Sequence, residues 1–443
     1  MLRLSWFALR AISATNRLIL RRFTPAGLVL AALLVAAAVM GIDTERSTTY
    51  QVFALAAALF VAAALFLWRF RPQLTVTRVL PPLATAGEPC NYCVRLENRG
   101  VVAERGLIVE DHRADPRPTC AQFLRSGVPP NARSFIERRS GYARWRWLIN
   151  RQGAIQLDSL HVDRLSPGQS IELAAQFTPA RRGVLRFESV LLARPDPLGL
   201  VKACRDVHQP QHICILPRRY RLPKLTLPGA RRYQQGGMAL AASVGDSEEF
   251  VSLREYRPGD PLKRVHWRSF ARTGKPVVKE FQDEFFERHC LVLDTFVGPE
   301  REAAFEAAVS VAASFVCAID THECLLDLLF VGDRPVAFTS GRGLLEPERL
   351  LELLAGAQPT NDRPFTELAA ELLGRRAELT SAILVFAQWD DTRNDLCKRL
   401  IALDVPLMAL AIVNPGERPD PVPAWLRVLD VGRVEQDLAR GLG

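Results

Sequence analysis

The sequence is poor in cysteine for its length and lacks the short motifs of several enzyme classes. Nine cysteines are scattered over 443 residues. That number is odd and too small for a scaffold held by disulfide bonds, so we expect reduced thiols in a reducing compartment. The chain contains no Gly-x-Ser-x-Gly, no His-Glu-x-x-His and no Gly-rich phosphate loop. These absences argue against a serine hydrolase, a zinc protease and nucleotide binding.

Most of the excess of basic over acidic residues lies at the start of the chain. Residues 1–80 contain nine arginines, no lysine, and only Asp43 and Glu45 as acids, which gives +7 of the formal net charge of +9. The rest of the chain has an ordinary charge balance, so we expect no nucleic-acid partner. A length of 443 residues predicts two or three domains, at roughly 100–200 residues each.

Two long uncharged stretches lie in this basic segment. Residues 23–42 form the first, over 20 residues, and residues 47–68 form the second, over 22 residues. A bilayer core needs about 20 apolar residues per helix. Residues 1–72 therefore predict a basic leader and a hairpin of two transmembrane helices, joined by the polar loop Asp43–Arg46. A pair of buried soluble helices and a cleaved signal peptide are the alternatives.

The placement of arginines predicts the orientation of this hairpin. Five arginines precede the first stretch, three closely follow the second, and the loop has one arginine against two acids. The positive-inside rule places both ends of the chain in the cytoplasm, in agreement with the reduced cysteines. Arg3, Arg10 and Arg17 recur every seven residues. This spacing favours either a helix on an anionic lipid surface or an unstructured basic leader.

Residues 73–217 are rich in short alternating runs, such as 74–79 and 171–177, divided by Gly, Pro and Asn. This pattern favours an antiparallel β-sandwich, and we see no long helical period. Cys90 and Cys93 have no second pair at zinc spacing, so we expect core thiols there and not a metal site.

Residues 218–288 form a linker with the densest pattern of the chain. Residues 257–260 predict a turn, and Asp260 is expected to cap a helix that begins at Pro261 and ends at Gly274. On that helix three side chains are expected to face a core: Leu262, Val265 and Phe270. Four others form a basic set: Lys263, Arg264, Arg268 and Arg272.

This segment has two interpretations. In the structural one, Arg254, Glu255 and Asp260 form ion pairs that lock the helix to the next domain. In the functional one, the basic set is a docking surface for an acidic partner, a lipid head group or a phosphate. The charge pattern leaves both open.

Residues 289–443 alternate between apolar strands and helices, which predicts a parallel sheet covered on both faces. Binding sites in such sheets lie at the carboxyl ends of the strands. That rule directs attention to Asp294 and to residues 387–389.

The segment from Glu249 to Phe281 resembles the signature of a bacterial family called domain of unknown function 58. The match consists of Arg254-Glu255-Tyr256, Gly259-Asp260, His266-Trp267, Ala271-Arg272 and Lys279-Glu280-Phe281. As candidate interaction or signature residues we single out Arg254, Glu255, Tyr256, Gly259, Asp260, Lys263, Arg264, His266, Trp267 and Arg272. Outside it, Asp196 to Gly199 agrees with the family, and the resemblance is expected over nearly the whole chain. It implies a membrane anchor and a C-terminal doubly wound α/β domain like von Willebrand factor type A. It also implies a MoxR-type AAA+ ATPase as partner.

The resemblance to the von Willebrand fold raises the question of a magnesium site. Asp294 and Thr366 match two of its five ligand positions, but Phe296, Gly298 and Gln388 stand at the other three. Phe296 and Gly298 have no side-chain oxygen for a hard cation. We therefore expect no metal and no cofactor, and we expect Asp294 to cap or pair locally.

These observations predict an α/β plus all-β protein with a transmembrane hairpin (1–72), a β-sandwich (73–217), a linker with the signature (218–288) and a von Willebrand factor A-like domain (289–443). The expected function is a non-enzymatic, multi-pass adaptor of the bacterial inner membrane, which acts with the ATPase in protein complex assembly or maturation. A hydrolase or other enzyme that uses Cys, His and Asp is the alternative. The sequence does not fix the oligomeric state.

Overall fold

A computed structural model divides the chain into two compact units. Residues 1–219 with 351–357 form the first, and residues 220–350 with 358–443 form the second. The structure describes residues 2–40, 47–125, 140–151, 155, 157–223, 249–260, 262–282, 287–319, 324–332, 335–341, 346–360, 363–414 and 416–441. The predicted loop Asp43–Arg46 and part of the predicted linker lie outside these residues. The domain boundaries predicted near residues 72, 217 and 288 stay predictions.

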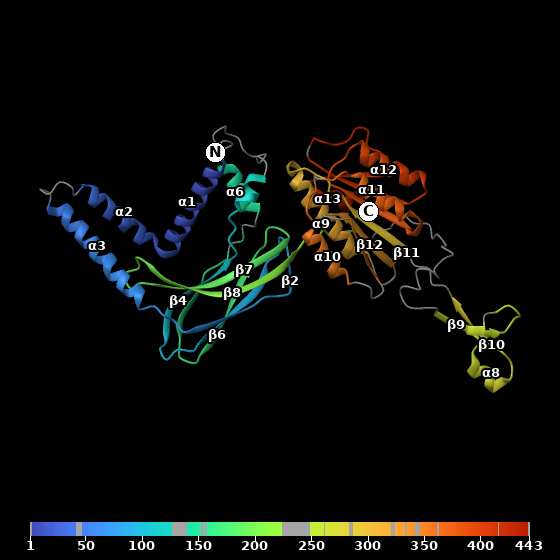
Figure 1. Cartoon of the computed structure of the whole chain (residues 1–443), viewed down its shortest axis with the longest axis horizontal. Coiled ribbons are helices and arrows are strands. Elements are labelled where there is room, and N and C mark those ends of the chain that lie inside the picture. The colour runs from blue at the N-terminus through green and yellow to red at the C-terminus, as the bar shows by residue number, and fades with distance from the viewer. Residues whose placement is uncertain are drawn as a thin grey trace. The chain divides into compact units, whose positions relative to one another are not determined.

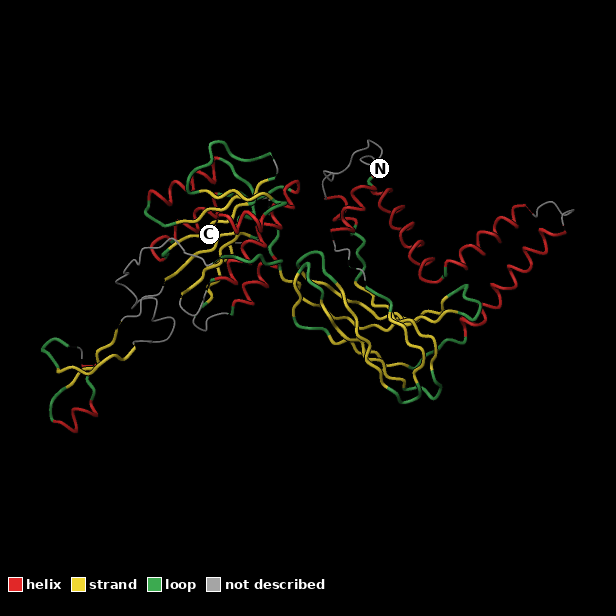
Figure 2. The backbone as a smooth tube through the Cα atoms, turned by 180° about the vertical axis from the view of Figure 1, so that it is seen from behind, coloured by secondary structure: helices red, strands yellow, loops and turns green. Residues whose placement is uncertain are grey.

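Three helices begin the first unit (Figures 1 and 2): α1 (Leu2–Arg22), α2 (Pro25–Met40) and α3 (Ser47–Trp68). The segment Thr48–Trp68 is the one helix among the described residues that is long and apolar enough to cross a membrane, and α2 is shorter. In α3, 11% of the most apolar window is buried, unlike the buried soluble helix that was the alternative. The structure therefore supports one candidate span, and the expected second span is not shown.

Eight strands of the first unit form two sheets. The first sheet is antiparallel, in the order β1 (Leu74–Val79), β3 (Cys90–Asn98) and β6 (Ser170–Phe177). The second has the order β2 (Leu83–Thr85), β8 (Lys202–Leu216), β7 (Gly183–Pro195), β4 (Glu104–Arg113) and β5 (Leu160–Leu165). The expected strand-rich unit is thus confirmed as β-rich sheets, which include a curled half-barrel (Figure 2).

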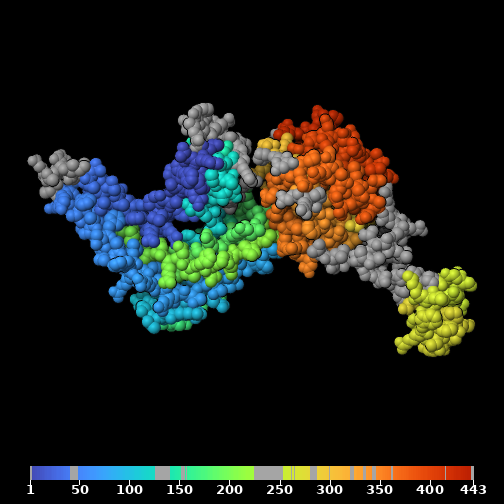
Figure 3. All heavy atoms as spheres, viewed as in Figure 1, coloured from blue at the N-terminus to red at the C-terminus, as the bar shows by residue number. Residues whose placement is uncertain are grey.

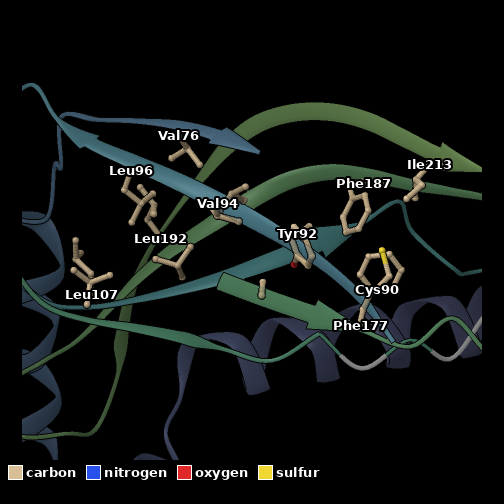
Figure 4. Close-up of a cluster of buried hydrophobic side chains, with 14 of the residues drawn as sticks. Val76, Cys90, Tyr92, Val94, Leu96, Leu107, Phe177, Phe187, Leu192 and Ile213 are labelled. Atoms are coloured by element: carbon tan, nitrogen blue, oxygen red, sulfur yellow. The ribbon is translucent and has the colours of Figure 1, made fainter. Parts of the chain in front are cut away.

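One hydrophobic core lies between the two sheets (Figure 4). Alternate residues of β3 are buried, beginning with Cys90, because successive side chains of a strand point to opposite faces. The ring of Tyr92 lies 5.7 Å from that of Phe177 and 6.0 Å from that of Phe187, centroid to centroid. Cys90 is buried in this core and Cys93 is half-buried; both are free thiols.

Two helices interrupt the strand-rich region, against the expectation that it has no helical period. These are α4 (Cys120–Arg125) and α6 (Tyr142–Arg151). Trp6 of α1 belongs to one buried cluster with Phe123 and Trp145, and Figure 3 shows the start of the chain in dark blue beside this teal segment. The basic leader is therefore helical and packed, so the alternative of an unstructured leader was wrong.

A fully buried ion pair lies inside the curled sheet. The guanidinium of Arg78 donates to both carboxylate oxygens of Asp111 and, at 2.9 Å, to the backbone oxygen of Gln209. The exposed side-chain fractions are 0% for Arg78 and 3% for Asp111. The guanidinium also lies 4.6 Å from the ring centre of Phe187. Arg78 was predicted only as a charge that follows the second apolar stretch, so this role was not foreseen.

The first prediction concerns this pair. Arg78→Met leaves the Asp111 carboxylate buried without its cation, so we expect the free energy of unfolding of the first unit to fall by about 3–5 kcal/mol. Hydrogen exchange of the β3 and β7 amides, in the detergent-solubilised chain, measures this loss. The matched control replaces both partners, Arg78→Met with Asp111→Leu, and should recover most of the stability. An equal loss of unfolding free energy in the single and the double variant would show that the unpaired Asp111 charge does not cause the loss.

The turn between β7 and β8 joins the helices to the half-barrel. The buried carboxylate of Asp196 accepts hydrogen bonds from the backbone N–H groups of Leu198, Leu200 and Val201, at 2.7–3.1 Å. Leu200 and Val201 are buried against side chains of α2 and α3. A Cβ atom on Gly27 of α2 would lie 1.9 Å from the Leu200 oxygen, so only glycine fits there.

The second prediction tests this close approach. Gly27→Ala must push the turn away from α2, and we expect it to cost about 1–3 kcal/mol, the usual effect of overpacking. The thermal unfolding of the detergent-solubilised chain provides the measurement. Gly374→Ala is the control, because a Cβ atom at that helical glycine meets no atom within 4 Å. Equal melting temperatures of the two variants would contradict the close approach of Gly27 to the Leu200 oxygen.

The second unit contains a mixed, mostly parallel α/β sheet, as expected. Its order is β13 (Pro335–Ser340), β12 (Cys324–Val331), β11 (Glu287–Leu293), β14 (Ser381–Phe386), β15 (Leu407–Val413) and β16 (Leu426–Asp430), with β13 antiparallel to β12. Four helices of this unit follow or separate these strands: α9 (Glu302–Ala318), α11 (Thr366–Gly374), α12 (Asp391–Ala402) and α13 (Val434–Gly441). Helix α10 (Pro347–Gly356) begins in this unit, and its residues from 351 on belong to the first. The edge strands β13 and β16 were not predicted.

Candidate functional site

The residues that carry the family resemblance form a small hairpin, which we call the signature module. It comprises β9 (Glu249–Glu255), a 3₁₀ turn (Leu262–Arg264), α8 (Trp267–Thr273) and β10 (Val277–Gln282), and β9 pairs antiparallel with β10. In Figure 3 it is the yellow body.

Asp260 fixes the turn that follows β9. Its carboxylate accepts two hydrogen bonds from the Arg254 guanidinium, both at 2.7 Å, and one from the backbone N–H of Arg257 at 2.8 Å. The Arg254 hydrogen bonds, with that of Arg257, lower the pKa of Asp260 to about 2. Gly259 has φ +109°, which only glycine adopts without strain. The Arg254–Asp260 pair of the structural interpretation is thus present, and it is internal to the module.

The expected helix from Pro261 to Gly274 was wrong in its first half. Pro261 itself lies outside the described residues. Val265 instead forms a β-bridge to Val278, and the helix α8 begins at Trp267, after His266. The described hydrogen bonds of the Asp260 carboxylate come from Arg254 and Arg257, which precede it in the chain. The end was predicted correctly, because Gly274 has φ +70° and donates to the backbone oxygen of Phe270 at 2.9 Å.

His266 and Tyr256 connect the two halves of the module through their backbones. The His266 N–H donates to Val277 O at 2.8 Å, and the Tyr256 N–H donates to Pro276 O at 3.0 Å. The His266 ring is 2.7 Å from the Ser269 hydroxyl. These contacts give both residues a structural role inside the module.

The module places large apolar side chains on its outside. Leu262, Trp267 and Phe270 are 66%, 60% and 38% exposed, and the rings of the last two lie edge to face. Sequence analysis expected Leu262 and Phe270 in a core, and both expectations were wrong. Of that set, Val265 is buried. Large exposed apolar side chains in such a small body are typical of a docking surface.

Charged side chains surround these apolar ones. Of the predicted basic set, three side chains are exposed: Lys263, Arg268 and Arg272. Glu255, at the end of β9, is also exposed. The side chain of Arg264 lies outside the described part of the chain. Exposed aromatic and basic groups together fit a protein partner with an acidic and apolar surface.

A second candidate position lies at the carboxyl end of β11. Asp294 is completely buried there, and Arg393 of α12 donates to its carboxylate at 2.6 Å through Nε. The same guanidinium donates to the backbone oxygen of Phe296 at 2.9 Å and to Asp390. The backbone N–H of Phe296 donates to Asp294 at 2.9 Å. Asp294 is therefore paired locally with the Phe296 backbone, while its charge partner Arg393 is distant in the sequence.

These residues do not fit a magnesium ion. A guanidinium already holds the Asp294 carboxylate, and Gln388 uses its amide to donate to Phe296 O at 3.2 Å. Thr366, at the start of α11, is exposed. The part of the chain that the structure describes contains no group of three or more His, Cys, Asp or Glu side chains arranged to hold a metal ion.

Because Asp294 is buried, its ionised form depends on the charge of Arg393. Desolvation raises the pKa of Asp294, and the charge and hydrogen bond of Arg393 oppose that rise. Arg393, 99 residues away, was not predicted, because nothing local distinguishes it from the exposed Arg399 of the same helix. The one signal was its place in the first turn of a helix that follows a parallel strand.

The buried thiols of this unit are not activated. Cys290 is completely buried, and burial raises its pKa. Burial raises the pKa of Cys397 to about 12. A nucleophilic cysteine needs a lowered pKa and access to solvent, and these two have neither.

The described architecture is that of N-terminal helices, curled β-sheets and a mostly parallel α/β sheet. Residues 252–436 match the family described as "Protein of unknown function DUF58". This match confirms the resemblance for that segment, which is less of the chain than the resemblance implied.

The comparisons with individual proteins add little about function. "Uncharacterized protein YeaD" of Bacillus subtilis (strain 168) is 25% identical over 209 residues, which are 47% of this chain and 51% of that protein. The chain thus spans about half the length of this relative. Among solved structures, the CARDB domain of a Pyrococcus furiosus protein has 16% identity and a TM-score of 0.17, over 31% of this chain and 87% of that one. Spo0M, a sporulation control protein of Bacillus subtilis, has 12% identity and a TM-score of 0.17, over 38% and 64%. Scores this low carry no argument.

The third prediction tests the buried pair. Arg393→Leu leaves Asp294 buried without its cation, so we expect the second unit to lose about 3–5 kcal/mol of unfolding free energy. Hydrogen exchange of the β11 and β14 amides measures it. The control Arg399→Leu removes an exposed arginine of the same helix and should stay within about 0.5 kcal/mol of the unaltered chain. Retained protection in the Arg393 variant would mean that Asp294 is protonated or solvated instead.

Proposed function

We propose that this protein is a non-enzymatic adaptor of the bacterial inner membrane, whose signature module docks a MoxR-type AAA+ ATPase during the assembly or maturation of a protein complex. The observation that carries the proposal is the exposure of Leu262, Trp267 and Phe270 beside three exposed bases. Interfaces are enriched in aromatic and arginine side chains, so this composition supports a protein partner.

The membrane anchor in this proposal is a two-span hairpin of α2 and α3. Both helices are free of charged side chains, they contact each other, and arginines flank them on the side of the chain ends. Arg21 and Arg22 precede α2, and Arg69 and Arg71 follow α3. The positive-inside rule supports cytoplasmic N- and C-termini on this arrangement.

The second unit serves as a binding scaffold in this proposal, with a doubly wound sheet like that of von Willebrand factor type A. Its usual metal position is filled by Arg393, and its buried thiols are unreactive, which supports a role without catalysis. Such a domain can still bind a client through surface loops.

The fourth prediction tests the docking surface in a crosslinked pull-down of the tagged full chain from its native membrane, read by mass spectrometry. We expect the unaltered chain to recover a MoxR-type ATPase. Trp267→Ala with Lys263→Glu removes one exposed aromatic and one exposed base, so recovery should fall about tenfold or more, as for other interface anchors. Arg254 is unsuitable as a probe, because its reversal would break the turn at Asp260.

The matched control carries Val101→Ala with Lys398→Glu. Val101 is 92% exposed and Lys398 is exposed, and the change in charge is the same. This control should retain the ATPase. Equal recovery by both variants would remove the module as the docking site, and absence of any ATPase from the unaltered chain would remove that partner.

A further inference from the structure

A cleft of about 260 Å³ lies against α1, within the first unit. Three of its arginines come from the last turns of α1: Arg17, Arg21 and Arg22. Arg117 contributes from the segment after β4, and Cys204 and Asp206 of β8 complete the polar lining. The volume is just under the range of about 300–1,000 Å³ of small-molecule sites, so a compact group fits better than a large ligand.

The cleft has more arginines than carboxylates. Arg21 forms an ion pair with Asp206. Asp115 is shared, because its carboxylate lies 3.4 Å from a nitrogen of Arg17 and 2.6 Å from Nε of Arg117. The lining itself therefore has four arginines and one carboxylate, Asp206. Beside it, Asp115 pairs with Arg17 and Arg117, and Glu110 lies close enough to Arg21 for their charges to interact. Four arginines thus meet three carboxylates, which leaves a small excess of positive charge.

One nitrogen of a cleft arginine, and one of an arginine that does not line the cleft, are buried without a hydrogen-bond partner. Among the described residues, Nε of Arg21 and one terminal nitrogen of Arg113, a neighbour of Arg17, are buried and have no hydrogen-bond partner. Burial, and then the charge of Arg17, lower the pKa of Arg113. Buried donors without acceptors are rare in folded proteins, and an anion would supply acceptors here.

The position of the cleft indicates where such an anion comes from. Arg22 ends α1, and Pro25 begins the apolar helix α2. A β-bridge between Phe23 and Val201 ties this junction to the start of β8, which supplies Cys204 and Asp206. The cleft therefore lies at the polar end of an apolar helix, which is the level of lipid head groups if α2 enters the bilayer.

The exposed apolar side chains of α1 also fit a position at the level of the lipid head groups. Leu4, Phe7 and Leu18 are 75%, 62% and 60% exposed. Their spacing of three and eleven residues places them on one stripe of the helix. A helix with exposed apolar side chains beside arginines is typical of the interface of an anionic membrane.

We propose that this cleft binds the phosphate of an anionic phospholipid, held by Arg17, Arg21, Arg22 and Arg117. The planar guanidinium forks match phosphate oxygens in pairs, which a lysine would not do. A free phosphate presents the same oxygens, so the experiment separates the two sources. The inference rests on the membrane-anchored part of the proposed function and does not involve the ATPase, so purified chain alone tests it.

The fifth prediction uses native mass spectrometry of the detergent-solubilised full chain, titrated with phosphatidylglycerol, with phosphatidylcholine or with inorganic phosphate. We expect phosphatidylglycerol to bind at least tenfold more tightly than phosphatidylcholine. Arg21→Gln with Arg117→Gln should weaken phosphatidylglycerol binding about tenfold. The control Arg3→Gln with Arg10→Gln removes the same charge from outside the cleft and should change binding less than twofold.

Equal weakening by the two double variants would show general attraction to a basic helix and overturn the site. Equal binding of both lipids would also overturn the proposal, because the cleft would then not distinguish an anionic from a zwitterionic head group. Inorganic phosphate that binds and displaces the lipid would assign the cleft to free phosphate and overturn the lipid source. If the cleft variant does not fold, a photoreactive phosphatidylglycerol on the unaltered chain decides: crosslinks should map to residues 14–22, 117 and 204–206, and crosslinks elsewhere would contradict the proposal.

Discussion

A carboxylate that leaves water needs a compensating cation or several hydrogen-bond donors, and each part of this fold depends on meeting that constraint. In the half-barrel, Arg78 holds Asp111. In the turn between β7 and β8, three backbone N–H groups donate to Asp196. In the signature module Arg254 holds Asp260, and at the carboxyl end of β11 Arg393 holds Asp294. Arginine serves in three of these places because its fork meets both carboxylate oxygens or one oxygen and a carbonyl together. The cleft beside α1 reverses the balance, because arginines there outnumber carboxylates, and the anion that we propose would complete the same arrangement.

The junction between the helices and the half-barrel has a second constraint, which is close backbone approach. The Asp196 carboxylate shapes the turn so that the Leu200 oxygen points at Gly27 of α2. Thr24, the residue before α2, donates through its hydroxyl to Leu200 O at 3.1 Å. The end of α1, the start of α2 and the start of β8 are thereby fixed together. That geometry brings Arg17 to Arg22 of α1 beside Asp206, so the fold of the turn determines the shape of the cleft.

Local sequence patterns predicted what depends on neighbours in the chain. The charge-free helices, the strands of the mostly parallel sheet and the helix end at Gly274 follow from composition, periodicity and backbone conformation. The family signature was readable for the same reason. The patterns failed where contacts between distant parts of the chain override local preferences. A helix from Pro261 seemed favourable, yet Val265 pairs with Val278 and delays the helix to Trp267. Arg393 and Arg78 look like surface charges until chain segments distant in sequence bring Asp294 and Asp111 to them. The arginines of α6 hid its helical period in the same way, because they lie between the aromatic residues that pack on α1.

The signature module shows how such polar contacts leave a surface free for binding. Val265 and Val278 are its buried apolar side chains among the described residues, too few to hold a body of this size by burial alone. Its shape depends instead on the Arg254–Asp260 pair, the strand ladder and the backbone bonds of Tyr256 and His266. Because polar contacts fix the backbone, Leu262, Trp267 and Phe270 are not needed for a core and remain exposed. Covering them with an apolar surface would remove large rings from water without changing the module, since their positions are already fixed by the helix and the turn. Polar contacts thus account for the shape of the module, and its unburied aromatic side chains remain available for the partner that we propose.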